Sequence, residues 1–235
     1  MKDFLIEHYT FLTHTVEIIA AVTGTIYVKK SRDKITRLFV YYLWLTVFVE
    51  NIALYSRFML NNYDNGLFNY IKNGPLCTNH WLYNVRSLVL IILLGKYYSK
   101  LVQKQTFKRI INALVIGFAI FFVFYFMFSS SFFNSGIQYG FMIRTVILTV
   151  FICLYFLSII QSDKILTFYR SKHFYIGVIL LIWSLGVTPL FIFDSYYKLT
   201  NPNFIEFRLL ILLCSNILMY LCFAVTFLYS FFRIS

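Results

Sequence analysis

Charged residues are scarce in this chain of 235 residues. They make up 13% of it, and only nine are acidic, against 21 lysines and arginines. A soluble globular domain carries about 25% charged residues. Here 60% of the residues are hydrophobic, and several apolar runs exceed the roughly 18 residues that indicate a membrane-spanning helix. The scarcity of charge therefore excludes an ordinary soluble domain and predicts an integral membrane protein.

Motifs of catalysis and metal binding are also missing. The sequence contains no GxSxG, no Walker loop, no HExxH and no glycine-rich nucleotide fingerprint. Its four cysteines form no CxxC pair, which argues against a zinc site. Cys153, Cys214 and Cys222 fall in apolar runs, and we expect them to be small core residues. We therefore predict a protein that is not an enzyme and has no catalytic residues, no metal and no cofactor.

Seven apolar runs predict an all-α integral membrane protein, with one domain that forms a seven-transmembrane-helix bundle. The expected spans cover residues 5–28, 36–60, 81–101, 108–128, 139–161, 173–193 and 207–232. Turn signals between residues 61 and 80 predict a longer loop on the outer surface. Charged residues such as Glu7 interrupt the first run, unlike the core of a cleavable signal, so we expect the first helix to be retained.

The distribution of basic residues predicts the orientation of the bundle. Lysines and arginines concentrate on the connections of one side, and cytoplasmic loops carry such an excess. We therefore expect the N-terminus outside and the C-terminus in the cytoplasm, in the inner (cytoplasmic) membrane of a bacterium. Only Lys2, Lys72 and Lys198 fall on the other side. The basic side holds Lys29, Lys30, Arg32, Lys34, Arg37, Lys96, Lys100, Lys104, Lys108, Arg109, Lys164, Arg170, Lys172 and Arg233.

The basic connections also suggest partners. They are short and carry no recognisable nucleic-acid-binding module, so we do not expect nucleic acid as a partner. Attraction to anionic lipid headgroups explains them more simply. Because no further domain is expected after the seventh span, we predict that the protein acts with a protein partner or as a homo-oligomer.

Ionisable residues inside the spans predict a binding site. Glu7, Thr10, His14 and Glu17 are spaced by three, four and three residues, which places them on one face of the first helix. Such a face must point into the bundle or toward water, because lipid cannot solvate it. The candidate ligand- or ion-binding residues are His14, Glu17, Glu50, Asn51, Arg57, Asn84, Arg86 and Arg144.

The buried charges are expected to pair. An arginine in hydrocarbon costs about 2.5–3.5 kcal/mol on insertion scales. We therefore expect Arg86 to meet Glu50 or Glu17, and Arg144 to take the other carboxylate or to be solvated from outside. Asn84 and Arg86 point about 200° apart on a helix, so only one of them needs to face the cluster. Polar pairs also join membrane helices without any further role. We favour a site, because four ionisable groups on several helices exceed what joining requires.

Known seven-helix families do not account for the chain. Microbial rhodopsins need a lysine in the seventh helix for the retinal Schiff base, and residues 207–232 contain none. The membrane hydrolases that include alkaline ceramidases carry zinc-binding histidines on the last helix, which has no histidine here. Small seven-helix sugar transporters carry Pro-Gln dipeptides, and this sequence contains none. The likeness to these families is limited to helix count.

Two functional hypotheses follow. The first is a multi-pass membrane sensor or accessory subunit whose outward-facing polar pocket binds a ligand and whose basic loops contact a partner. The alternative is an oligomeric ion channel or membrane-disrupting effector, for instance in a defence module. An intramembrane lipid-modifying enzyme is a third, less favoured reading. The inner halves of the spans are mostly apolar or small, which predicts a pocket closed below and favours the sensor.

Overall fold

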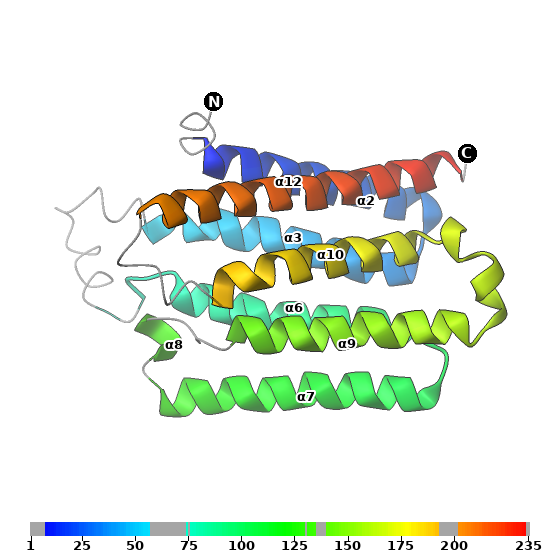
Figure 1. The fold of residues 1–235 in the computed structure, drawn as a ribbon, viewed down its shortest axis with the longest axis horizontal. Helices are drawn as coiled ribbons and strands as arrows, with labels where there is room; N and C mark the ends of the chain where they lie inside the picture. Colours follow the sequence, from blue (N-terminus) through cyan, green and yellow to red (C-terminus); the bar gives the residue numbers. More distant parts are fainter. Residues whose placement is uncertain are drawn as a thin grey trace.

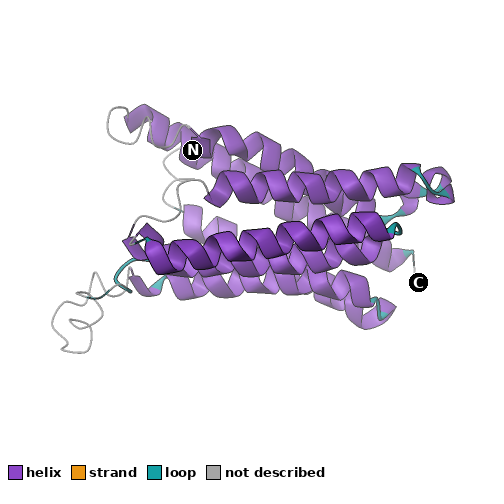
Figure 2. Cartoon of the chain, turned by 90° about the horizontal axis from the view of Figure 1, so that it is seen from below, coloured by secondary structure: helices purple, strands orange, loops and turns teal. Residues whose placement is uncertain are grey.

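The computed structural model describes residues 8–56, 74, 76–129, 131–134, 140–192 and 202–233. All regular structure in these residues is helical, and the long helices lie side by side (Figures 1 and 2). Seven helices are long: α2 (Tyr9–Ser31), α3 (Lys34–Ala53), α6 (His80–Leu101), α7 (Gln105–Phe128), α9 (Gly140–Ile160), α10 (Lys172–Ile192) and α12 (Pro202–Phe232). The short helix α8 (Ser131–Asn134) and two 3-10 turns, Asp163–Leu166 and Phe168–Arg170, lie in the connections.

Six of the long helices are long and apolar enough to cross a membrane: α2, α3, α7, α9, α10 and α12. This confirms the prediction of an all-helical membrane protein. Helix α6 has 22 residues but is less apolar, since it includes Arg86, Lys96 and Lys100. Its crossing, and with it the count of seven spans, stays a prediction. The loop expected over 61–80 lies largely outside the described residues.

Six helices form a closed ring in the order α2, α3, α6, α9, α10 and α12. Each packs against its neighbours in this order, and α12 packs against α2 to close the ring. Figure 1 shows α12 and α2 side by side at one edge of the bundle. Helix α7 lies outside the ring and packs on α6 and α9. In this arrangement α2 and α9 are opposite members of the ring.

Short connections place helices that follow one another at the basic end, such as α2 and α3, antiparallel. Helix α2 ends where Arg32 adopts a left-handed conformation with φ of 53°, which turns the chain away from the helix axis. Asp33 then caps α3, because its carboxylate accepts hydrogen bonds from the backbone N–H groups of Ile35 (2.8 Å) and Thr36 (3.2 Å). Residues 102–104 join α6 and α7 in the same compact way.

One end of the bundle is strongly basic. It contains the connections 32–33, 102–104 and 161–171, and we call it the basic end. Its exposed lysines and arginines include Lys29, Lys30, Arg32, Lys34, Arg37, Lys100, Lys104, Arg109 and Arg170. The other end of the bundle carries the start of α2 and the end of α3. The two ends are thus the two sides that the sequence distinguishes by charge.

Buried aromatic side chains fill the ring toward the basic end. We call this set the aromatic floor; it consists of Tyr27, Phe39, Tyr97, Tyr98, Phe151, Phe223 and Phe227, each 4% exposed or less. Phe39 of α3 packs edge-on against Phe223 of α12, with ring centroids 5.0 Å apart, and tilted against Tyr97 of α6 at 5.6 Å. Edge-to-face and tilted pairs add to the stabilisation from apolar burial. These rings occupy the interior at this level.

The cysteines in the spans are not core residues. Cys153, Cys214 and Cys222 are exposed on the outside of the bundle, so the expectation that they lie in the core is wrong. The physical reason is that lipid is as apolar as a protein core. A small apolar side chain therefore fits either face of a spanning helix, and hydrophobicity alone does not say which face it occupies.

Candidate functional site

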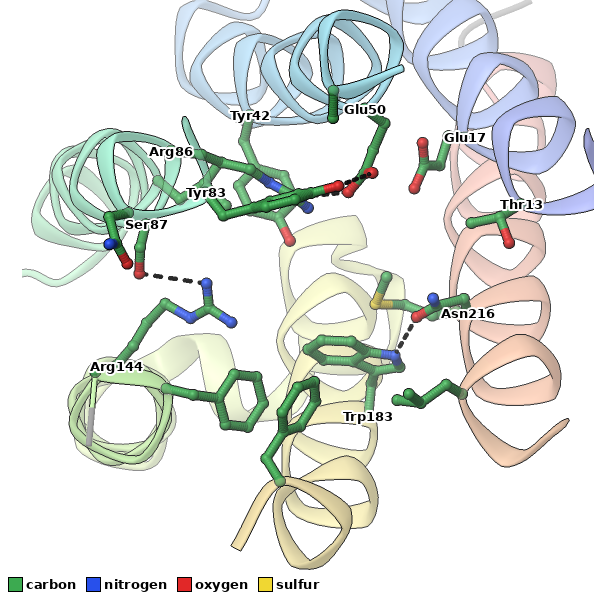
Figure 3. A pocket seen from close by; sticks show the side chains of 18 of the residues that line it. Thr13, Glu17, Tyr42, Glu50, Tyr83, Arg86, Ser87, Arg144, Trp183 and Asn216 are labelled. Carbon is green, nitrogen blue, oxygen red and sulfur yellow. Dashed lines mark hydrogen bonds and ion pairs between the residues drawn. The ribbon is translucent and has the colours of Figure 1, made fainter. Parts of the chain in front are cut away.

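A cavity of about 1060 Å³ lies inside the ring, and all six ring helices contribute to its wall. Along α6 the lining extends from Tyr83 to Leu94, about 16 Å of helix. Figure 3 shows polar side chains from several helices pointing toward this common centre. The charged residues sit far from the basic end, since Glu50 lies near the end of α3 and Arg144 near the start of α9. The charged part of the cavity therefore lies on the side of the aromatic floor that is away from the basic end.

Arg86 and Glu50 form an ion pair between α3 and α6, toward the end of the bundle opposite the basic end. Arg86 Nη1 donates to Glu50 Oε1, and the hydroxyl of Tyr83 donates to Glu50 Oε2 at 3.0 Å (Figure 3). The two charged side chains are 18% and 22% exposed. Both oxygens of Glu50 thus have a donor, so this carboxylate is satisfied within the protein. Of the two partners expected for Arg86 from the sequence, Glu50 and Glu17, the structure pairs it with Glu50.

Glu17 of α2 is buried and forms no ion pair with the lysines and arginines that the structure describes. Its residue is 3% exposed, and its Oε2 atom has no hydrogen-bond partner in the described part of the chain. Glu50, Arg86 and the Tyr220 hydroxyl of α12 interact with it electrostatically. Arg86, however, donates to Glu50 instead. A buried carboxylate with an unused oxygen is costly unless something else satisfies it.

Arg144 of α9 has no carboxylate partner among the described residues. Its Nη1 donates to the Ser87 hydroxyl at 3.3 Å, and its guanidinium lies over the ring of Phe141, 4.8 Å from the centroid. A hydroxyl and an aromatic face stabilise a cation less than a carboxylate does. The sequence predicted either the second carboxylate or outside solvent for Arg144. Its contacts instead leave most of its five N–H donors free to bind another group.

The rest of the wall is apolar and aromatic, with one further polar pair. The indole N–H of Trp183 on α10 donates to Asn216 Oδ1 on α12 at 2.9 Å. Phe141 and Phe191 stack with centroids 3.9 Å apart and connect α9 to α10. Leu180 and Met219 complete this side. The wall can thus hold an apolar group between polar ends, as ligand sites commonly do.

The structure brings together six of the eight candidate residues. His14, Glu17, Glu50, Asn84, Arg86 and Arg144 all line the cavity. Asn51 does not; it is exposed, and its amide donates to the carbonyl of Val47 at 2.7 Å. Arg57 lies outside the described residues. The amide of Asn84 donates to the backbone carbonyl of Phe132 in α8 at 2.8 Å, so it holds the connection after α7 in place.

Sequence reasoning missed several polar residues of the site. Tyr83 and Ser87 contact the two arginines and their partners, yet neither is ionised, so neither drew attention. A signal was present, since Tyr83, Arg86, Ser87 and Leu90 are spaced by three, one and three residues on one helical face. Trp183 and Asn216 form a pair between spans that only the packing of α10 on α12 brings together.

No protein-family model, curated protein or solved structure matches the chain. The chemistry of the site then stands on its own residues. The described residues hold no group of three His, Cys, Asp or Glu side chains close enough for a metal ion. What the cavity presents is charge of both signs beside an apolar wall, which suits recognition of a ligand.

Proposed function

We propose that this protein is a multi-pass membrane sensor or accessory subunit that binds a small ligand in the polar cavity. The observation that carries the proposal is the cavity of about 1060 Å³. Within the described residues, it is lined by a carboxylate with an unsatisfied oxygen and by an arginine that no carboxylate bonds. Ionisable groups inside a membrane bundle mark functional sites by default. If these charges only joined helices, Glu17 and Arg144 would be expected to have mutual or neighbouring partners.

The aromatic floor supports a closed pocket rather than a path through the chain. A conducting path needs polar groups or water along its whole length. Tyr97, Phe151 and Phe223 are fully buried below the cavity, and they come from α6, α9 and α12. Ligand binding above this floor would alter helix packing, and the basic end would present the change to a partner or to anionic lipid headgroups.

We further propose that α6 spans the membrane as the seventh helix, with the basic end in the cytoplasm. Helix α6 occupies a full position in the ring between α3 and α9, and its buried arginine is paired inside the ring. Its lysines, Lys96 and Lys100, lie toward the basic end. The opposite end, with the cavity, would then face outward. This orientation follows the asymmetry of lysine and arginine.

Single cysteines at Arg32, Lys104 and Phe168 are expected to react with a membrane-impermeant maleimide only from the cytoplasmic side. All three positions are exposed in connections of the basic end, so the reagent reaches them wherever it has access to that side. Labelling would be compared in intact and permeabilised cells, in a background in which the four native cysteines are replaced by serine. Labelling of any position in intact cells would contradict the orientation.

Ion flux separates the proposed function from a channel. Proteoliposomes that contain the purified protein are expected to retain potassium and chloride gradients as well as protein-free vesicles do, for wild type and for Glu50→Gln alike. An added ionophore shows that the assay detects conduction. Flux in wild type that Glu50→Gln alters would make this a conducting protein with the carboxylate in the pathway, and the sensor proposal would be abandoned.

A further inference from the structure

A carboxyl group and a guanidinium line the cavity without forming an ion pair in the part of the chain that the structure describes. Among the described residues, the Oε2 atom of Glu17 has no hydrogen-bond partner, and the residue is 3% exposed. Arg144 donates a hydrogen bond to the Ser87 hydroxyl and lies over the Phe141 ring. Both side chains line the same cavity. Figure 3 shows them on opposite sides of it, with the Arg86–Glu50 pair between α3 and α6. A carboxylate and a guanidinium that face one space would normally pair with each other.

The ring geometry prevents that pairing. Glu17 belongs to α2 and Arg144 to α9, which are opposite members of the six-helix ring and do not pack against each other. The groups nearest to each do not compensate them. Arg86 is bonded to Glu50, so the two carboxylates on the α2–α3 side share one guanidinium. That side thus holds two carboxyl groups for one bonded guanidinium, and α9 holds a guanidinium that no carboxylate bonds among the described residues.

Between these charges the wall is apolar. Leu180, Trp183 and Met219 come from α10 and α12, and Phe141 stacks on Phe191 beside Arg144. A simple anion would satisfy Arg144 and leave Glu17 alone, and a simple cation would do the reverse. A molecule with opposite charges at the two ends of an apolar body satisfies both Arg144 and Glu17 and packs against the apolar wall between them.

We propose that the ligand is a small zwitterion with an apolar body, which binds Arg144 through its anionic group and Glu17 through its cationic group. The proposal rests on the proposed function, because it names the ligand class of the same cavity. Its chemistry is that of a short apolar peptide, in which an ammonium group and a carboxylate lie at the two ends of an apolar body. Arg144 then forms charge-assisted hydrogen bonds with the carboxylate, and Glu17 accepts them from the ammonium.

The test uses matched probes on the full chain in detergent. The probes are the homodipeptides of leucine, phenylalanine and tryptophan, each as the free zwitterion, the N-acetylated acid and the C-terminal amide. Binding is measured by the shift of the thermal unfolding midpoint and by calorimetric titration. At least one free zwitterion is expected to bind, and its acetylated and amidated forms are expected to bind at least about tenfold more weakly, since each lacks one charged contact.

Two variants test which residue binds which end of the ligand. In Glu17→Gln, N-acetylation is expected to cause no further loss, because the ammonium partner is already gone. In Arg144→Gln, amidation is expected to cause no further loss for the same reason. Asp163→Asn and Arg109→Gln are the matched controls, since both residues are exposed outside the cavity. The comparison of probes on wild type remains valid even if one variant does not fold.

The outcomes separate this inference from the proposed function. Equal binding of the free, acetylated and amidated forms would overturn the zwitterion and leave a ligand pocket. The absence of any shift with all probes would overturn it too, and the flux assay would still decide between pocket and channel. Binding that requires both charges, but that Glu17→Gln and Arg144→Gln do not affect, would overturn the assignment of the two residues.

Discussion

Replacement of Glu50 by leucine is expected to lower the free energy of unfolding by about 3 kcal/mol. The substitution leaves the guanidinium of Arg86 inside the ring without its carboxylate, and it removes the acceptor of the Tyr83 hydroxyl. Removal of one partner of a buried ion pair costs about 3–5 kcal/mol. We take the lower value because the side chains of Arg86 and Glu50 are still 18% and 22% exposed. Reversible unfolding in mixed detergent micelles, followed by circular dichroism, measures the loss.

The second substitution in the same pair is expected to restore stability. Glu50→Leu combined with Arg86→Met removes both members of the pair, so neither is left without its partner, and the double variant should come within about 1 kcal/mol of wild type. Asp163→Leu, in the exposed 3-10 turn after α9, serves as control and should change stability by about 0.5 kcal/mol or less. Strict additivity of the two single effects would mean that the side chains do not interact.

Replacement of Asp33 by alanine is expected to have the next largest effect, a loss of about 2 kcal/mol. The Asp33 carboxylate caps α3 and also accepts hydrogen bonds from the Thr36 hydroxyl at 2.6 Å and from Lys172 Nζ at 2.8 Å. His173 Nε2 lies 3.8 Å from it. Since Lys172 and His173 begin α10, this one side chain joins α3 to α10. Asp33→Asn keeps a good cap and loses only the charge, so it should cost about half as much.

The Asp33 contribution is also expected to depend on pH. Burial by itself would raise the pKa of this carboxyl, but hydrogen bonds from Lys172 and Thr36 and the charge of Lys172 hold the pKa well below its usual range. The unfolded chain therefore binds the proton more readily than the folded one. The contribution is complete above the unfolded pKa, near 4, and is lost as the pH falls through the folded value.

The measurement is the difference in unfolding free energy between wild type and Asp33→Asn, from pH 7 to pH 3. The difference is expected to be constant down to about pH 5 and to shrink below about pH 4, because only wild type has this carboxyl to protonate. Asp163→Asn is the control, since its carboxyl is exposed. A difference that grows on acidification would show that the Asp33 carboxylate is not stabilised by folding.

Much of the architecture could be predicted because lipid imposes simple rules on sequence. Backbone groups must be paired within each span, so long apolar runs become helices. The third run, expected over 81–101, corresponds to α6 (His80–Leu101), and the fifth, over 139–161, to α9 (Gly140–Ile160). The pairing of Arg86 with Glu50 or Glu17 followed from depth alone. Depth along the helix is read directly from the number of residues.

Two features could not be predicted from the sequence: which face of each helix points into the ring, and which helices are neighbours in it. Asn51 follows Glu50 directly, yet it points out of the ring, because one residue is about 100° of turn. The sequence allowed Arg144 to pair with Glu17, but their helices are opposite members of the ring, which depth along the helix does not reveal. Asn84 and Arg86 both line the cavity, although they point in different directions from α6. Asn84 bonds to α8, and Arg86 bonds to α3.

The closed ring has a consequence for biosynthesis. Glu50 precedes Arg86 by 36 residues, which corresponds to roughly 2–7 s of translation at about 5–20 residues per second. During that interval the carboxylate enters the insertion machinery before its guanidinium exists. The interval is longer for Glu17, because α12, which closes the ring against α2, is made after the other five ring helices. The newly made helices therefore need a polar or chaperoned environment until the ring is complete.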